Sequence, residues 1–322
     1  MKHYNRRDFI KVSSLAFGAV SIAGLPLSCG RSSEKSTGNS FKYGFCNESL
    51  QDLSWARQCE IIGNAGYTGV EIAPFSLVEK GVKEISAGDR KQMVRDMENA
   101  GIQCLGLHWL LSPPPKGLHF TTPDDQVRQK SVDYLDALVD FCGDLGGKVM
   151  IFGSPGQRST TKGLTVEEAM DYFADGLAQV ANHAQQRDVK ILVEPLSSDQ
   201  TDVVNTLGDA MKIVNKVDHP AISTMFDFHN TVDETEPMHE LIRKYYDHIH
   251  HIQFQDMDGT LMRTDEITPE FVQVFKVLNE LNYDKWISVE VFDFSPGGKK
   301  IAEESMKTFK EIEKREEKLR ES

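Results

Sequence analysis

The sequence lacks an excess of positive charge. It has 36 lysine and arginine residues against 49 aspartate and glutamate residues, which gives a net charge of −13. A protein that binds nucleic acid needs a basic surface against the phosphate backbone, so this balance argues against a nucleic-acid partner. The sequence also lacks the glycine-rich Gly-x-x-x-x-Gly-Lys loop that cradles nucleotide phosphates in many enzymes.

Cysteine is also scarce, with five residues in the chain: Cys29, Cys46, Cys59, Cys104 and Cys142. Their scattered spacing matches neither a zinc site nor a disulfide framework. We expect the last four to be small, buried, apolar side chains. The spacing leaves open a disulfide between them in an oxidising compartment.

The sequence lacks an apolar run near its N-terminus that is long enough and apolar enough to favour a membrane-spanning helix. The apolar run from Val12 to Leu27 is short and rich in serine and glycine. Arg6 and Arg7 precede this run, and such a pair is typical of a twin-arginine export signal.

The end of this run is similar to the cleavage site of a bacterial lipoprotein. Cys29 follows "GLPLS" and precedes a glycine, although Pro26 stands where leucine is usual. We therefore expect a signal peptide at residues 1–28 and a flexible tether at 29–40. The mature protein is expected in the periplasm, or held at a membrane only through a lipid on Cys29.

After residue 40, short β-branched runs alternate eight times with helix-like segments. Ser86 with Asp89, and Thr165 with Glu168, have the spacing of capping boxes at the start of two helices. Strands that alternate with helices predict a parallel sheet with right-handed crossovers, and eight such units close a barrel. We therefore expect one domain, a (β/α)8 TIM barrel, over residues 41–322.

Four oxygen-bearing residues stand at the ends of the last four predicted strands. They are Glu194 in "ILVEPL", Asp227 in "STMFDFHN", Gln253 in "IHHIQFQD" and Glu290 in "WISVEVFD". In a barrel of this kind the C-terminal strand ends converge on one face, where the active sites lie. Four oxygen ligands at that face suit a divalent cation, with Mn²⁺ or Mg²⁺ favoured.

The chain resembles the sugar phosphate isomerase/epimerase family of xylose isomerase-like barrels over residues 41–312. The stretches that carry the resemblance are "GVEIAPF", "GLHW", "LVEPL", "FDFHN", "HHIQFQDMDG" and "ISVEVFD". In that family a Glu, an Asp, a His and a Glu on strands five to eight hold one divalent metal. The resemblance thus implies the same role for the four residues at the strand ends.

Gln253 departs from the family pattern, because it stands where the family has histidine. The oxygen of a glutamine side chain can bind a hard cation, and related dehydratases look similar in using an amide here. Zn²⁺ becomes a less favoured metal as a result. His251 lies two residues earlier, on the same face of the strand, and stays open as the alternative ligand.

The resemblance implies proton transfer next to the carbonyl of a keto-sugar. Glu194 and Glu290 are the candidate catalytic pair, one on each face of the sugar. A lyase or dehydratase acting on 3-keto-glycosides or related keto-sugars is the alternative enzyme, because it needs the same metal and base. A non-catalytic sugar-binding lipoprotein is the alternative from another class.

Four further side chains are candidates for contact with a small carbohydrate substrate. Glu71 and His108 end the second and third strands, and the resemblance implies a substrate-binding Glu at the former. Arg158 follows the fourth strand and is either a substrate clamp or a solvated loop arginine. Near the sixth strand, either His229 or Asn230 could serve as the polar group behind the ligands, with His229 slightly favoured. The sequence leaves the oligomeric state open and is compatible with a homo-oligomer.

The export signal gives a testable prediction. If Cys29 carries a lipid, the wild-type protein should sediment with membranes and the Cys29→Ala variant should be released from them. Cell fractionation followed by immunoblotting measures this difference. The prediction is wrong if both proteins stay in the cytoplasm with residues 1–28 attached.

Overall fold

The computed structural model describes residues 41–161 and 163–321. The predicted signal peptide and tether, with Cys29, lie outside these residues. Within the described part of the chain, no helix is both long enough and apolar enough to cross a lipid bilayer.

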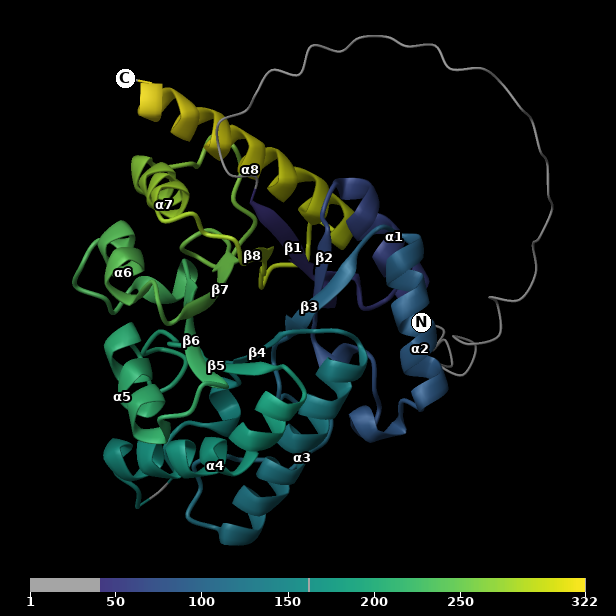
Figure 1. Cartoon of the computed structure of the whole chain (residues 1–322), viewed down its shortest axis with the longest axis vertical. Helices are drawn as coiled ribbons and strands as arrows, with labels where there is room; N and C mark the ends of the chain where they lie inside the picture. Colours follow the sequence, from purple (N-terminus) through teal and green to yellow (C-terminus); the bar gives the residue numbers. More distant parts are fainter. Residues whose placement is uncertain (1–40, 162, 322) are drawn as a thin grey trace, which may run out of the picture. The chain divides into compact units, whose positions relative to one another are not determined.

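Eight parallel strands follow one another around the molecule in chain order, and the first pairs with the last, so the sheet is a closed barrel (Figure 1). The strands are β1 (Lys42–Cys46), β2 (Gly69–Ile72), β3 (Gln103–Leu107), β4 (Val149–Phe152), β5 (Lys190–Val193), β6 (Ile222–Asp227), β7 (Ile249–Phe254) and β8 (Trp286–Val289). This topology confirms the expected single-domain (β/α)8 TIM barrel.

Helices follow the strands and cover the outside of the barrel (Figure 1). Ser86 and Thr165 form the two predicted capping boxes, with the side chains of Asp89 and Glu168 bonding back to them. The helices are α1 (Trp55–Ala65), α2 (Ala87–Asn99), α3 (Asp125–Asp144), α4 (Val166–Gln186), α5 (Leu207–Val217), α6 (Met238–Tyr245), α7 (Pro269–Glu280) and α8 (Gly298–Glu321). Short 3-10 turns connect them at η2 (Asn47–Leu50), η3 (Pro74–Ser76), η4 (Val82–Glu84), η5 (Pro155–Gln157) and η6 (His229–Thr231).

Side chains fill the inside of the barrel. Leu105, Val149, Ile151, Leu192 and Met225 form a buried apolar cluster against which Trp286 packs. Trp286 is the first residue of β8, so this apolar cluster reaches the N-terminal end of the barrel. Polar residues line the C-terminal end. A second and larger core lies between the strands and the helices.

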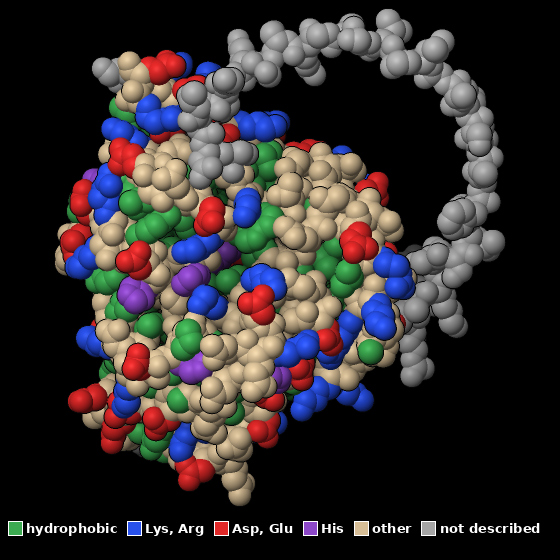
Figure 2. Space-filling view, viewed as in Figure 1, with side chains coloured by type: hydrophobic (Ala, Val, Ile, Leu, Met, Phe, Trp, Pro, Cys, Tyr) green, Lys and Arg blue, Asp and Glu red, His purple; other side chains and the backbone are tan. Residues whose placement is uncertain are grey.

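The outer surface is mixed in charge. Figure 2 shows acidic and basic side chains interspersed over the visible face of the described residues. Many of them form exposed pairs, such as Lys148 with Asp188 at 2.6 Å. Exposed pairs of this kind contribute little to stability, so the helices owe their positions mainly to the apolar core.

Arg158 is a buried connection between the ends of two strands. Its side chain has no exposed surface. Nη1 donates to the backbone oxygens of Phe152 at 3.0 Å and Glu194 at 2.7 Å, and Nη2 donates to that of Val204 at 3.3 Å. The first carbonyl belongs to the last residue of β4, the second to the residue directly after β5, and the third to the loop before α5. The structure therefore gives Arg158 a structural role, in place of the substrate contact that the sequence suggested.

This role predicts that arginine-to-lysine substitution lowers the free energy of unfolding more at Arg158 than at an exposed arginine. Arg158→Lys removes the planar fork that reaches three carbonyls and leaves some of them unpaired, so the free energy of unfolding should fall by about 2 kcal/mol or more. Arg95→Lys on the exposed face of α2 should change it by less than about 0.5 kcal/mol. Urea unfolding followed by circular dichroism measures both values, and equal effects would contradict the assignment.

Candidate active site

Three of the four strand-end residues meet at the C-terminal mouth of the barrel. Glu194 directly follows β5, Asp227 is the last residue of β6, and Glu290 directly follows β8. All three side chains are buried, and each offers a carboxylate oxygen within 4.8 Å of the other two. A group of oxygen atoms this close has the size and chemistry of a site for a divalent cation.

The three carboxylates oppose one another electrostatically. Burial raises the pKa of Glu194, and the charge of Asp227 raises it further. Burial also raises the pKa of Glu290, with the charge of Glu194 as the next cause. Asp227 has its pKa raised by burial to about 6. A cation among the three would relieve this repulsion and favour the ionised forms, so the group fits a metal ligand set.

Gln253 faces the same mouth from β7, where it pairs with Asp227 across the β6–β7 ladder. Its side chain is fully buried, and its Nε2 donates to Glu71 Oε1 at 2.8 Å. The other end of the amide, Oε1, is buried without a hydrogen-bond partner. Because an unpaired buried oxygen is costly, this atom also fits a cation ligand.

Glycine and asparagine shape the surroundings of the carboxylates. A Cβ atom on Gly153 would lie 2.1 Å from Glu194 Oε2, so glycine at this position makes room for the carboxylate. Asn230 donates its side-chain N–H to Asp227 Oδ2 at 2.5 Å and to Glu194 Oε1 at 3.4 Å. The polar group behind the candidate ligands is therefore Asn230.

His229 takes a different position from the one that we favoured from the sequence. Its backbone N–H donates to Asp227 Oδ1 at 3.0 Å, and its charge lowers the pKa of Asp227 against the larger effect of burial, but no ring nitrogen bonds to a carboxylate of the group. Nδ1 lies 2.8 Å from the backbone oxygen of Met257, and the ring packs edge-on against Phe292. The side chain is only partly buried at the rim of the site, so contact with a sugar stays a prediction for His229.

Glu71 is the centre of a buried network below the mouth. Its Oε2 accepts from Ser288 Oγ at 2.6 Å and lies 2.8 Å from His251 Nε2. Although burial raises the pKa of Glu71, the charges of His251 and His108 outweigh it and lower the pKa to about 2. His251 thus pairs with Glu71 and Ser288 Oγ, at 2.8 Å, rather than with the three carboxylates. This placement favours Gln253 over His251 as the ligand from strand seven.

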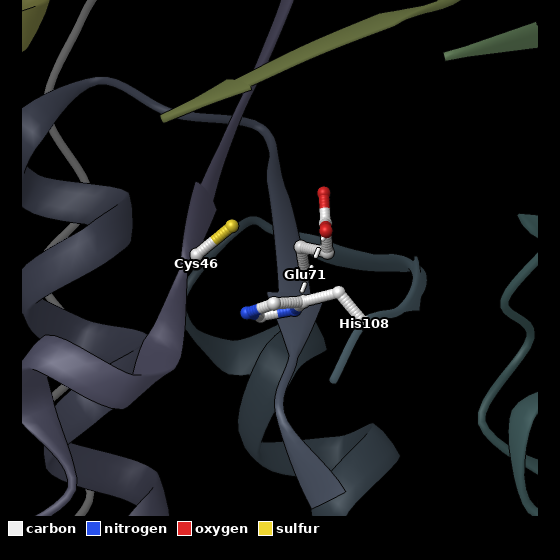
Figure 3. Close-up of side chains that lie close together, drawn as sticks. All are labelled: Cys46, Glu71 and His108. Atoms are coloured by element: carbon white, nitrogen blue, oxygen red, sulfur yellow. Dashed lines mark ion pairs between the residues drawn. The ribbon is translucent and has the colours of Figure 1, made fainter. Parts of the chain in front are cut away.

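His108 lies directly after β3 and is almost completely buried. Its Nδ1 lies 3.3 Å from Glu71 Oε1, and its Nε2 lies 3.0 Å from Glu48 Oε2 and 3.7 Å from Glu290 Oε1. Figure 3 shows the ring beside Glu71 and Cys46. Burial raises the pKa of the Cys46 thiol well above its usual value, which disfavours the thiolate form that metals bind.

Sequence reasoning missed two residues of the site, Glu48 and Trp109. Glu48 follows β1 by two residues, so an inspection of the first strand end for acidic residues would have found it. Trp109 donates its indole N–H to Glu290 Oε1 at 2.8 Å and has a left-handed backbone with φ of 51°. It lies edge-on to both Phe75 and Phe292, with ring centroids 6.2 and 6.3 Å away. The three rings form an apolar wall beside Glu290.

Two relatives carry names of sugar-processing enzymes. The chain is 25% identical over 191 residues to a "Probable ketose 3-epimerase" of Synechocystis sp., and the match covers 56% of this chain and 62% of that protein, less than two thirds of its length. It is 21% identical over 280 residues to an inosose dehydratase of Clostridium beijerinckii, with 77% and 86% of the two chains covered.

A solved structure with the same fold is that of D-psicose 3-epimerase with D-tagatose from Clostridium cellulolyticum H10. The two structures superpose with a TM-score of 0.72, over 84% of this chain and 99% of that chain. The sequence identity is 15%, so this likeness demonstrates the shared fold alone.

The family model of the xylose isomerase-like TIM barrel matches residues 59–312. This range includes seven of the eight barrel strands and all four predicted metal ligands. The match confirms the resemblance on which the sequence argument depended. The chain belongs to the xylose isomerase-like TIM barrel family.

Proposed function

We propose that this protein is a sugar epimerase or isomerase that depends on a divalent metal and moves a proton at the carbon next to a keto-sugar carbonyl. The observation that carries the proposal is the convergence of Glu194, Asp227 and Glu290 at the mouth of the barrel. The ketose 3-epimerase relative supports a small carbohydrate as the substrate.

Glu194, Asp227, Gln253 and Glu290 would hold the metal. Their donor atoms are all oxygens, which suit Mg²⁺ or Mn²⁺ better than Zn²⁺. The unpaired buried Oε1 of Gln253 supports its place in this set. When bound, such a cation stabilises the negative charge that develops on a carbonyl oxygen as the neighbouring carbon loses its proton.

Glu194 and Glu290 are the proposed acid and base. They follow β5 and β8, which are not neighbours in the barrel, so their carboxylates reach a bound sugar from different sides. One would take the proton from the carbon and the other would return a proton to the opposite face, which inverts that carbon. The hydrogen bonds from Asn230 to Glu194 and from Trp109 to Glu290 support a fixed orientation for each carboxylate.

A dehydratase or lyase is the second candidate function. The amide of Gln253 at the strand-seven position and the inosose dehydratase relative favour it. The same base would remove the same proton, and a group on the next carbon would then leave as water or as an aglycone. Keto-sugars with a leaving group in that position, such as 3-keto-glycosides, are the substrates that fit this reaction.

We also propose that the enzyme works outside the cytoplasm. The support for this location is the pair Arg6 and Arg7 before an apolar run and Cys29 after it. A keto-sugar or a keto-glycoside suits such a location better than a sugar phosphate does, because phosphorylated sugars are mainly intracellular.

The test of the proposed reaction is incubation with a panel of keto-sugars and 3-keto-glycosides in D2O with Mn²⁺, followed by NMR. Deuterium at a retained carbon next to the carbonyl supports the epimerase or isomerase. Loss of water or of an aglycone supports the dehydratase or lyase instead. Binding of a sugar without exchange or cleavage of any compound would overturn both.

The metal site predicts a loss of activity and stability on chelation. A ligand that binds only the native state raises the free energy of unfolding by about 2.7 kcal/mol at 100 times its Kd. Protein treated with EDTA should therefore be inactive and melt at a lower temperature, and Mn²⁺ or Mg²⁺ should restore both properties. Full activity in protein that elemental analysis finds free of metal would contradict the prediction.

The acid–base pair predicts that Glu290→Gln separates catalysis from metal binding. The amide keeps an oxygen for the metal but cannot accept a proton. Turnover should fall by about 100-fold or more, the usual size of a general-base contribution, while metal occupancy falls much less. Glu60→Gln, on the exposed surface of α1, is the matched control and should keep full turnover. Unchanged turnover in Glu290→Gln would exclude Glu290 as the base.

A further inference from the structure

A second group of potential metal ligands lies beside the first and shares one residue with it. The group consists of Glu48, His108 and Glu290, from the ends of β1, β3 and β8. A ligand atom from each lies within 4.8 Å of the others. His108 Nε2 is 3.0 Å from Glu48 Oε2 and 3.7 Å from Glu290 Oε1. The group combines one imidazole nitrogen with two carboxylates, so it is more than a cluster of acids.

Two of the three residues in this group present atoms without an aligned hydrogen bond within the described residues, whereas Glu290 Oε1 accepts from the Trp109 indole. Glu48 and His108 are 3% and 1% exposed, so water does not reach them freely. Glu48 Oε2 and both ring nitrogens of His108 are close to their neighbours but not aligned for hydrogen bonds. Polar atoms that are buried and unpaired in this way are rare in folded proteins and indicate an unseen partner, such as an ion.

The other side of the His108 ring is arranged as in a metal-binding histidine. Nδ1 faces Glu71 Oε1 at 3.3 Å, and the other oxygen of Glu71 is held by Ser288 Oγ at 2.6 Å and lies 2.8 Å from His251 Nε2. A histidine that binds a metal through one nitrogen usually presents its other N–H to a carboxylate. With the proton on Nδ1, the lone pair of Nε2 points toward the carboxylates of Glu48 and Glu290. A lone pair and two negative charges repel one another, so a positive charge among these three groups is required.

We propose that Glu48, His108 and Glu290 bind a second divalent cation, and that Glu290 bridges it to the cation held by Glu194 and Asp227. Two carboxylates and one imidazole suit Zn²⁺ or Mn²⁺. Three protein ligands leave positions open for an oxygen of the substrate or for water. The site goes beyond the proposed function, which requires a single metal.

The alternative source of positive charge is a second proton on His108. An imidazolium between Glu48 and Glu71 would satisfy the same carboxylates without a metal. The two alternatives differ in the number of cations that the chain binds. A measurement of metal stoichiometry therefore separates them, whatever the reaction of the enzyme.

The experiment titrates chelated, full-length protein with Mn²⁺ and measures the bound metal by equilibrium dialysis with elemental analysis. The wild type should bind two Mn²⁺ ions, with an EPR spectrum of exchange-coupled ions, because a shared carboxylate holds metals about 3.5–4 Å apart. Glu48→Gln and His108→Gln should each bind one ion and lose the coupling. Asp227→Ala should also bind one, and the Glu48→Gln/Asp227→Ala double variant none. Glu79→Gln, an exposed substitution, should keep two.

One result would overturn the second site and leave the first intact. In that case the wild type binds one Mn²⁺, Asp227→Ala binds none, and Glu48→Gln and His108→Gln still bind one. The positive charge on His108 would then be a proton. If the Glu48 and His108 variants fail to fold by circular dichroism, the stoichiometry and EPR coupling of the wild type decide the question alone.

Discussion

The burial of negative charge at one end of the barrel is the constraint on which the site depends. Glu48, Glu71, Glu194, Asp227 and Glu290 are each 6% exposed or less. Carboxylates removed from water in this way are unstable unless positive charge or hydrogen-bond donors surround them. The barrel brings the five together because the C-terminal ends of its parallel strands converge. The rest of the barrel interior is filled by the apolar cluster around Leu192 and Met225.

The protein supplies part of the compensating charge from its own side chains. Glu71 has His251, His108, Ser288 and Gln253 around it and is fully balanced. Glu194, Asp227 and Glu290 receive hydrogen bonds from Asn230 and Trp109. Arg158 acts on Glu194, His229 on Asp227 and His108 on Glu290, but the pKa values of all three carboxyl groups stay raised, with burial as the largest cause. This difference supports the proposed cation among Glu194, Asp227 and Glu290, whereas Glu71 already has partners within the protein.

The sequence predicted the barrel and the strand-end residues because both follow from local patterns. β-Branched runs identify strands, and a residue such as Glu194 or Glu290 directly after a strand must lie at the C-terminal face. The roles of Arg158 and Trp109 could not be predicted in this way, and the sequence could not decide between Asn230 and His229 for the polar group behind the carboxylates. Arg158 binds carbonyls from two other segments, and Trp109 reaches a carboxylate 181 positions away in the chain. Such contacts depend on how loops fold over the barrel, which no periodic pattern encodes.

The amide at the seventh strand has a consequence for the conditions under which the site can work. A histidine ligand must lose its proton before it binds metal, so sites that contain histidine release the ion as the solution becomes acidic. Gln253 has no proton to lose, and its N–H is already engaged by Glu71, so the buried oxygen is the end of the amide left without a hydrogen bond among the described residues. Within the proposed ligand set of Glu194, Asp227, Gln253 and Glu290, acidification would therefore act on the three carboxylates, whose pKa values burial already raises. In the proposed site the amide therefore removes one group that acid would protonate, and the carboxylates set the pH at which this ligand set releases its cation.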